Sequence, residues 1–294
     1  MGKLYFGLDD AKYNAIPAIR ATALKAGVRS MRAMRHTMTR NGKEPTAAMI
    51  DGSLMHIGAS DPEALDRIAA VWDGGRRQGK DWKLFESDNQ DKLITTQARL
   101  DVVKEQLAHI KLDPVSGPIM NQILETEVCA QWTDPLYGPG KCKFDGLGQH
   151  FFVDFKSASE VKHHKFMSNG ETLGYPLQFG WYGNGWREAA AKSFGELHHA
   201  YCIVIGTKDE LDVVVYELSL DKITDAYERT RKDPDEPRVW MGAREIACEY
   251  RACCATESWP GQANNRILQW ERPAWASRPP DPVQLTIGGE KVTL

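Results

Sequence analysis

The chain has 294 residues, of which 42% are hydrophobic and 26% are charged, and its formal net charge is -3. This composition is ordinary for a globular protein and excludes wholesale disorder. The near-balanced charge provides no overall basic field, so a nucleic-acid partner would have to be bound by local patches. The length allows one large domain or two modest ones with a substantial core.

The N-terminal sequence and the cysteines indicate a cellular compartment. The start, MGKLYFGLDD, carries two aspartates where a secretory signal needs an apolar segment. No apolar run approaches the roughly 20 residues of a membrane helix. We therefore expect a cytoplasmic protein with reduced thiols and no membrane association. The late cysteines Cys248, Cys253 and Cys254 are poorly spaced for an iron–sulfur cluster, and no C-x-x-C pair indicates zinc.

The first part of the chain, to about residue 120, is predicted to be mainly helical. Residues 61–72 begin with Asp and Pro, which is typical of a helix N-terminus. Residues 90–110 place apolar side chains at helical spacing, and the basic, glycine-rich residues 74–83 are expected to form a loop. In chain order the predicted helices are 15–38, with a break near Gly27, then 46–59, 61–72 and 90–110.

Beyond this part the sequence has the pattern of strands. Short runs of β-formers, separated by glycine-containing turns, predict a meander of three strands over 125–134, 141–148 and 150–158. The elements predicted next are a helix over 174–192, a hairpin over 199–219 that turns at 208–210, a helix over 220–233 and a short strand at 283–287.

Helices around a central meander indicate an α/β (α+β) fold. We expect one domain over residues 1–270, with a helical part over about 1–120 and a β-meander core over about 121–225. Residues 271–294, which contain the run RPPDP, are expected to form an extended tail.

The third predicted strand contains a D-x-K pattern at Asp154 and Lys156. Alone the pattern is unspecific, because it recurs at residues 10–12 and 81–83. Side chains alternate along a strand, so the Asp154 carboxylate and the Lys156 ammonium point to the same face of the sheet. Whether these charges belong to a functional site depends on the charged residues of the neighbouring strand.

The preceding strand carries Asp145. A two-residue turn at Gly148-Gln149 would pair Asp145 with Phe152 and make it a diagonal neighbour of Asp154 on one face. A three-residue loop would instead turn Asp145 to the opposite face. The shared face therefore depends on the register of the hairpin.

Two carboxylates held a few ångströms apart repel each other unless a cation lies between them. Oxygen ligands of this kind suit Mg²⁺ or Mn²⁺. A lysine beside them can orient or deprotonate a water molecule, or stabilise charge in a phosphoryl transition state. These residue types indicate metal-assisted phosphodiester hydrolysis. The alternative is a pair of aspartates near a strand end, with Lys156 as their surface partner.

Five segments in order carry a family resemblance: GSLMH (52–56), ETEVCAQW (125–132), KFDGLG (143–148), VDFKSAS (153–159) and GYPLQFGWY (174–182). The series resembles the PD-(D/E)xK nuclease superfamily and, within it, phage exonucleases like exodeoxyribonuclease VIII, the RecE-like group. The similarity extends over roughly residues 15–225. It implies a restriction-endonuclease-like core with a central mixed β-sheet flanked by helices. Phe144 replaces the usual proline before Asp145, and Ser157 stands where relatives tend to carry threonine.

The resemblance implies a role for each matching residue. The implied metal ligands are His56, Asp145, Asp154 and the backbone carbonyl of Phe155, and the implied catalytic residues are Lys156, Asp154, Asp145, Glu127, Gln178 and Tyr182. Glu125 competes with Glu127 for the glutamate position, but its spacing to Trp132 is wrong. Gln178 and Tyr182 lie four residues apart on one helix face and would brace the site or hold the DNA end.

The resemblance also implies an activity. It is that of a Mg²⁺-dependent exonuclease, with Mn²⁺ as a substitute, that digests double-stranded DNA ends 5′ to 3′ and leaves a 3′ tail. The tail would pass to a single-strand annealing protein in phage-type recombination, in a bacterial or phage-infected cell. Relatives of this kind form homo-oligomeric rings, so a trimer or tetramer is expected. The alternatives are an endonuclease with the same core, for restriction or repair, and a catalytically silent DNA-binding protein.

Two basic segments are candidates for contacts with the DNA backbone. The predicted loop offers Arg76, Arg77 and Lys80 together with Trp82, which could stack on a frayed base. The run KHHK offers Lys162 and Lys165 directly after the D-x-K strand. Ordinary solvated loops are the alternative for both segments.

Overall fold

The computed structural model describes residues 2–39, 45–207, 211–229 and 241–262, and the backbone of two strands within 284–293. The chain divides into two compact units, Met1–Gly261 and Gln262–Leu294. Within the described ranges, no helix combines the length and the apolar character needed to cross a membrane.

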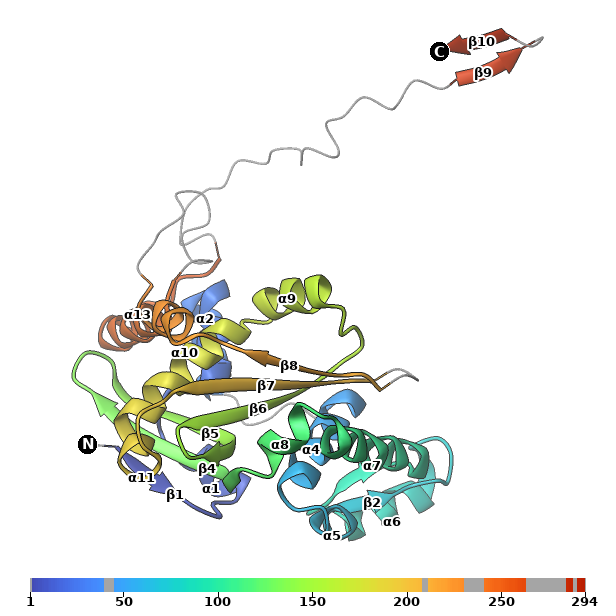
Figure 1. Ribbon diagram of the computed structural model, residues 1–294, viewed down its shortest axis with the longest axis horizontal. Coiled ribbons are helices and arrows are strands. Elements are labelled where there is room, and N and C mark those ends of the chain that lie inside the picture. Colours follow the sequence, from blue (N-terminus) through green and yellow to red (C-terminus); the bar gives the residue numbers. More distant parts are fainter. Residues whose placement is uncertain are drawn as a thin grey trace. The chain divides into compact units, whose positions relative to one another are not determined.

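A six-stranded mixed sheet forms the centre of the first unit, in the order β1-β4-β5-β6-β7-β8 (Figure 1). Its strands are β1 (Lys3–Tyr5), β4 (Ile123–Asp134), β5 (Gly138–Gly148), β6 (Phe151–Ala158), β7 (His199–Gly206) and β8 (Val213–Glu217). Neighbouring strands are antiparallel except β6 and β7, which are parallel. A parallel pair requires a long crossover, and helices provide it here. The mixed α/β fold and the three-stranded meander are as predicted, whereas β1 is too short to have been recognised.

The helices before the meander are α1 (Asp10–Ala15), α2 (Ala21–Arg29), α3 (Met31–Thr39), α4 (Ala47–Ser60), α5 (Ala64–Ile68), α6 (Gly79–Asp88), α7 (Gln97–Leu112) and α8 (Ser116–Met120). The predicted break near Gly27 occurs at Ser30, whose extended backbone separates α2 from α3. Helix α4 begins after Thr46, whose hydroxyl accepts the backbone N–H of Met49 at 3.3 Å. This cap fixes the start of the helix that carries His56.

Three helix boundaries in this region differ from the prediction. The helix predicted over 61–72 ends at Ile68, because Ala69–Val71 form strand β2, and the helix predicted over 90–110 starts at Gln97, because Leu93–Thr95 form β3. These strands pair in parallel as a separate two-stranded sheet. Three residues are too few to show a strand alternation, and the pairing partner lies more than twenty residues away in the chain. The predicted loop over 74–83 becomes helical from Gly79 onward.

The crossover from β6 to β7 contains α9 (His163–Thr172), α10 (Tyr175–Gly185), a π-helical turn (Trp186–Ala190) and α11 (Ala191–Phe194), and α12 (Leu220–Glu228) and α13 (Ala243–Thr256) follow β8. The helix predicted over 174–192 therefore continues through a π-helical turn, and α12 ends at Glu228, before the predicted residue 233. In the second unit β9 (Gln284–Ile287) pairs with β10 (Glu290–Thr293), and β9 corresponds to the predicted strand. The predicted turn at 208–210 and most of the predicted tail lie outside the described residues.

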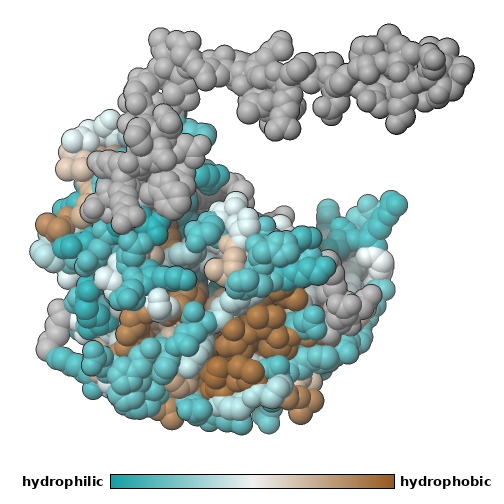
Figure 2. All heavy atoms as spheres, turned by 45° about the horizontal axis from the view of Figure 1, so that its top comes forward, coloured by the Kyte–Doolittle hydropathy of each residue, from teal (hydrophilic) through white to brown (hydrophobic). Residues whose placement is uncertain are grey.

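Strand β6 has apolar side chains on both faces of the sheet. Phe152 packs in one core cluster with Phe179 of α10, whereas Phe155 packs in a second cluster with Leu54 of α4 and Leu107 of α7. Figure 1 shows α10 with α2 and α13 on one side of the sheet, and α4 with α7 on the other. The face of the molecule in Figure 2 is mostly hydrophilic, with hydrophobic areas between the hydrophilic ones. A strand buried on both faces explains why this stretch reads as a nearly continuous apolar run interrupted by Asp154.

The register of the β5–β6 hairpin differs from the prediction by two residues. Leu147 pairs with Phe152, so the predicted pairing of Asp145 with Phe152 is wrong, and Gln149-His150 form the turn. In this register a Cβ at position 148 would lie 2.1 Å from the Phe151 ring and 2.8 Å from the Gln122 carbonyl oxygen, so the observed pairing requires a glycine there. The displacement by two residues preserves the alternation of side chains, but the regular pairing ends at Gly146 and Val153, before the two aspartates.

Candidate metal centre and active site

The hydrogen-bonded ladder between β5 and β6 runs no further than Gly146 and Val153. Beyond that point the Asp145 side chain takes over, because its Oδ2 accepts the backbone N–H of Phe155 at 2.8 Å. Both aspartates are nearly inaccessible to solvent, with 7% of Asp145 and 1% of Asp154 exposed. The two buried carboxylates, of Asp145 and Asp154, therefore lie where the regular pairing of β5 and β6 has ended.

Helix α4 brings a histidine to this point. The Nδ1 atom of His56 lies 3.2 Å from Oδ1 of Asp145, and the His56 ring meets Phe155 edge-on at 6.1 Å between centroids. The segment GSLMH supplies this histidine because Leu54 and Met55 are buried and anchor the helix on the sheet. Both oxygens of Asp145 therefore have partners, one from the backbone and one from a helix.

Glu127 of β4 completes a group of three potential ligands. In the described part of the chain, one group of His, Cys, Asp or Glu side chains has its ligand atoms within 4.8 Å of one another, and it consists of His56, Glu127 and Asp145. Glu127 has a φ of 53°, in the left-handed region that is costly for a side chain with a Cβ. Glu125 pairs with Leu147 in the ladder and is exposed. The geometry therefore favours Glu127 over Glu125 as the site glutamate.

These three residues fit a divalent cation. They offer one imidazole nitrogen and two carboxylates in a partly buried place, which suits Mn²⁺ or, with water ligands added, Mg²⁺. Burial and the neighbouring Asp145 charge raise the pKa of Glu127, although Lys143 opposes them. A cation among the carboxylates would relieve this repulsion.

A second group of contacts surrounds Asp154. Its Oδ1 accepts a hydrogen bond from Nε2 of Gln178 at 2.7 Å, and its Oδ2 forms an ion pair with Lys156. The Lys156 ammonium also donates to the backbone carbonyl of Phe155 at 3.2 Å. Asp154 and the Phe155 carbonyl, both predicted as metal ligands, thus contact Lys156 and lie outside the group formed by His56 and its neighbours.

The environment separates the two aspartates in acidity. Burial raises the pKa of Asp154, and the Asp145 charge adds to this against the opposing Lys156. Burial acts in the same sense on Asp145, but the positive charges of His56 and Lys156 outweigh it and lower the pKa of that carboxyl. Burial would lower the pKa of Lys156, yet the two aspartates raise it above its ordinary value. Lys156 is therefore held as an ammonium ion, which favours charge stabilisation over proton abstraction.

Lys25 of α2 was not among the predicted site residues. Its ammonium donates to Oε1 of Gln178 at 2.6 Å and lies 5.1 Å from the centroid of the Tyr175 ring. Lys156 lies over the same ring at 5.3 Å. The feature of the sequence that could have indicated a role for Lys25 is its position as the one charged residue in the run ATALKAG. The sequence could not have indicated its partner, because Gln178 lies 153 residues further along the chain.

The chain has a counterpart among known protein families. The family described as "PDDEXK-like domain of unknown function (DUF3799)" matches residues 23–257 of this chain. The chain belongs to the DUF3799 family. The description names the PDDEXK-like fold and no activity. No curated protein matches the sequence.

A solved structure with similarity to this DUF3799 protein supports the same fold. It is described as "Putative exonuclease" from Eubacterium rectale, with 15% sequence identity, a TM-score of 0.56, and coverage of 92% of this chain and 97% of that chain. At this identity the likeness concerns the fold alone. Candida albicans Rai1 in complex with pU5-Mn²⁺ aligns at 9% identity over 84% of this chain and 68% of that chain, with a TM-score of 0.28, too low to carry an argument.

In the DUF3799 domain Tyr182 is half-buried and packs against the core. Its ring packs against Phe144 and Phe152, with centroids 5.4 and 6.2 Å away. Burial raises the pKa of its hydroxyl well above the ordinary value. Gln178, one helical turn earlier, contacts Asp154 directly. The shared helix face predicted for Gln178 and Tyr182 thus serves two purposes: one residue contacts the site and the other packs beneath it.

The two basic segments lie apart from each other. Figure 1 shows α6 beside β2 and α9 on the α10 side of the sheet. Near α6, the guanidinium of Arg77 donates to the Ile94 carbonyl at 2.9 Å and lies 5.2 Å from the Trp82 ring centroid, while Trp82 also meets Trp72 edge-on. With Phe85 at 6.3 Å as well, the Trp82 ring already has three neighbours, which leaves less room for a stacked base.

The remaining basic residues have fewer constraints. Arg76 and Lys80 are exposed, as are Lys162 and Lys165 at the start of α9. Lys165 lies 3.4 Å from a carboxylate oxygen of Glu160, so part of its charge is balanced.

A hollow of about 870 Å³ lies between α2 and the first turn of α10. Lys25 and Arg29 line it together with threonines of α2 and α3. Because the Lys25 ammonium also contacts Gln178, this hollow lies next to the Asp154 group.

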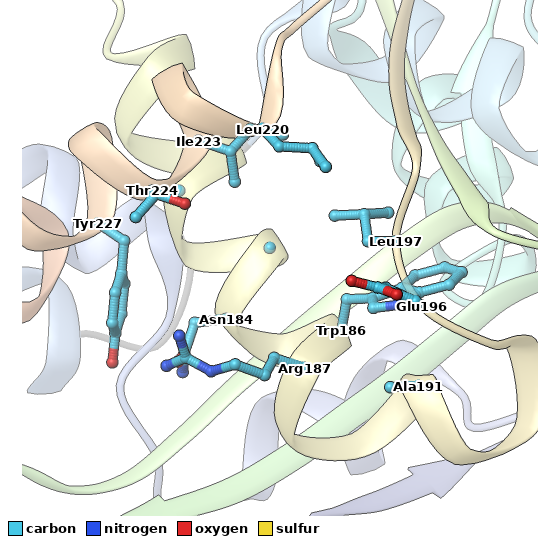
Figure 3. Close-up of a pocket in the computed structure, with 12 residues that line it drawn as sticks. Asn184, Trp186, Arg187, Ala191, Glu196, Leu197, Leu220, Ile223, Thr224 and Tyr227 are labelled. Atoms are coloured by element: carbon cyan, nitrogen blue, oxygen red, sulfur yellow. The ribbon is translucent and has the colours of Figure 1, made fainter.

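A second hollow, of about 280 Å³, lies between the later part of α10 and α12 (Figure 3). Leu220 and Ile223 lie on one side, and Arg187 is directed toward the ring of Tyr227, 5.6 Å from its centroid. None of the predicted site residues lines this hollow. It is separate from the acidic group.

Proposed function

We propose that this protein is a metal-dependent exonuclease that hydrolyses phosphodiester bonds at the ends of double-stranded DNA. The observation that carries the proposal is the convergence of two groups. His56, Glu127 and Asp145 form a potential cation site, and the Asp154–Lys156 ion pair lies on the adjacent strand. Mg²⁺ is the proposed ion and Mn²⁺ its substitute, since both accept carboxylate ligands.

The negatively charged residues and the positively charged Lys156 have different proposed roles. A divalent ion held by His56, Glu127 and Asp145 would supply Lewis-acid activation of a phosphoryl oxygen and of water. The Lys156 ammonium is placed to bind a phosphate oxygen and to stabilise negative charge that develops there. Asp154 holds this ammonium by an ion pair, and Gln178 holds Asp154 by a hydrogen bond.

The preference for DNA ends and the 5′ to 3′ direction rest on the resemblance of the sequence motifs to those of the RecE-like exonucleases. The charged residues that line the hollow between α2 and α10 are Lys25, Arg29, Arg229 and Glu171. Its basic side chains outnumber the acidic one, which supports a polyanionic substrate beside the site. The exposed Arg76, Lys80 and Lys162 are proposed as further phosphate contacts. A 3′ single-stranded tail would be the product and would pass to a single-strand annealing protein in phage-type recombination.

A homo-oligomeric ring, of three or four subunits, is proposed on the same resemblance. Native mass spectrometry of the purified chain tests the assembly. A trimeric or tetrameric mass is the expected result, and a monomer at micromolar concentration would count against a ring.

The test of the activity uses linear duplex DNA labelled at the 5′ or the 3′ end, with Mg²⁺ or Mn²⁺. We expect stepwise loss of the 5′ label, no digestion of a covalently closed circle, and at least a hundredfold loss in Asp145→Asn and Lys156→Ala, since each removes a charge from the site. Lys12→Ala is the matched control, because Lys12 also belongs to a D-x-K sequence but pairs with Asp9 on the exposed surface.

Each rival has its own outcome in this test. Cleavage of the closed circle would show an endonuclease with the same core. Binding of DNA without digestion in any metal would show a catalytically silent DNA-binding protein. Equal digestion by the wild type, Asp145→Asn and Lys156→Ala would reject the assignment of these residues.

A further inference from the structure

Lys143 lies on β5 between two carboxylates from different parts of the chain. Its ammonium forms ion pairs with Glu127 of β4 and with Asp10 of α1, the latter at 2.8 Å. The Lys143 and Glu127 side chains are 18% and 29% exposed, whereas that of Asp10 is 80% exposed. One end of this arrangement is therefore partly enclosed, and the other end faces solvent.

The position of Asp10 over β5 is fixed by a buried lysine. The ammonium of Lys141, a residue only 1% exposed, donates to the backbone carbonyls of Tyr13 at 2.6 Å and Ile16 at 2.9 Å at the end of α1. Lys141 and Lys143 are alternate residues of one strand, so both reach the same side. These hydrogen bonds hold α1, which carries Asp10, against β5, which carries Lys143. The ion pair between Asp10 and Lys143 is therefore supported by a buried contact between the two elements.

Glu127 is also one of the three potential cation ligands. A divalent cation bound to Glu127 would repel the Lys143 ammonium, because both are positively charged. The two would also compete for the same Glu127 carboxylate. Binding of the cation therefore has to weaken the contact between Lys143 and Glu127. Asp10 offers the displaced ammonium a second carboxylate that is already within ion-pair distance.

We propose that Lys143 is a built-in counter-ion that sets the affinity of the site for a divalent cation, and that Asp10 retains the Lys143 ammonium when the cation takes Glu127. This inference rests on the cation site of the proposed function. It assigns a role to the aspartate of a D-x-K sequence, residues 10–12, that lies outside the catalytic strand. Lys143 and Asp10 act on the cation through Glu127, so they are positioning residues and do not bind substrate.

The two residues should change cation affinity in opposite directions. Lys143→Met removes the competing charge, so we expect Mn²⁺ to bind about three to ten times more tightly, as for an ion pair that is partly shielded from solvent. Asp10→Asn leaves Lys143 with Glu127 alone, so we expect binding to weaken about two- to fivefold. The double variant should bind as Lys143→Met does, because Asp10 acts through the lysine.

The measurement is isothermal titration of the full-length protein with Mn²⁺ alone, without DNA. Lys12→Met is the matched control: it removes an exposed lysine from the same helix, where Lys12 pairs with Asp9, and should leave the affinity unchanged. Lys143→Arg keeps the charge and should bind nearly as the wild type does. Thermal unfolding of each variant without metal separates loss of fold from loss of binding.

Several outcomes would overturn the inference. Unchanged or weaker Mn²⁺ binding by folded Lys143→Met would show that the lysine only holds Glu127 in place. An effect of Asp10→Asn that persists without Lys143 would show that Asp10 acts directly. If the wild type cuts DNA and binds Mn²⁺ while these variants match it, the inference fails alone. If the wild type binds no Mn²⁺, the cation site fails and the inference fails with it.

Discussion

The carboxylate of Asp145 takes the place of a strand partner for Phe155. Its Oδ2 accepts the Phe155 N–H at 2.8 Å, at the point where the β5–β6 ladder has ended. One oxygen of Asp145 is thereby fixed by the backbone, and the other is directed toward His56. The same side chain thus has a structural role and a chemical one, and the two can be separated by substitution.

Asp145→Asn should separate these roles. Asparagine keeps an oxygen for the Phe155 N–H but loses the charge, so we expect a folded protein without nuclease activity. Asp145→Ala leaves a buried N–H without its partner, so its free energy of unfolding should be about 1–3 kcal/mol lower than that of Asp145→Asn. Urea unfolding of both variants checks the difference, and equal stabilities would show that the hydrogen bond contributes nothing net.

Lys25 should influence catalysis through Gln178. The amide of Gln178 is placed between an ammonium that can only donate and a carboxylate that can only accept, so its orientation is fixed at both ends. We expect Lys25→Met to lower kcat about tenfold, which corresponds to one charge-assisted hydrogen bond. In a Gln178→Ala background the same substitution should have little further effect. Additive losses in this double-mutant cycle would mean that Lys25 acts on the substrate directly.

Lys25 and Lys143 should give opposite dependences of stability on pH. Burial and the nearby Lys156 charge lower the pKa of Lys25 from 10.5 to about 8, although Asp154 opposes them. Between these values the unfolded chain holds the proton and the folded chain does not, so this residue makes the free energy of unfolding rise with pH. Tyr175 and Cys202 are the other titratable groups that face the Lys25 ammonium.

For Lys143, burial is outweighed by Glu127 and Asp10, which raise its pKa above 10.5. Its stabilising contribution is therefore complete below that pH and is lost only above it. In urea unfolding between about pH 7.5 and 10, the wild type should gain stability relative to Lys25→Met as pH rises. The difference from Lys143→Met should stay constant over the same range. A constant difference for both variants would contradict the lowered pKa of Lys25.

Gly52 offers a test of the segment GSLMH. A Cβ at this position would meet no atom within 4 Å, and the residue lies inside α4, one turn before His56. Gly52→Ala should therefore raise the free energy of unfolding by about 0.5–1 kcal/mol through helix propensity. If nuclease activity falls while stability rises, the open space beside Gly52 is used by the substrate. A less stable variant would instead show that α4 packs there. Gly58→Ala is the contrasting control, because its Cβ would lie 2.4 Å from Leu107.

The sequence alone determined the features that depend on local periodicity. The run HFFVDFKSA specifies a strand with apolar side chains on both faces, and Asp154 and Lys156 follow from its alternation. The displacement of the hairpin by two residues kept the alternation of side chains along β5 and β6, although Asp145 contacts His56 of α4 and Asp154 contacts Gln178 of α10, two helices on opposite sides of the sheet. The four-residue spacing of Gln178 and Tyr182 likewise specified a shared helix face.

Only the tertiary structure decided which distant charges meet these residues. Lys25 contacts Gln178 across 153 residues of chain, and Asp10 contacts Lys143 across 133. It also decided the turn at Gln149-His150, which leaves Gly148 inside the strand with the Phe151 ring too close to admit a Cβ. Local patterns specify the direction of a side chain relative to its own strand or helix. The partner in that direction is set by how the elements pack, which no short stretch of sequence contains.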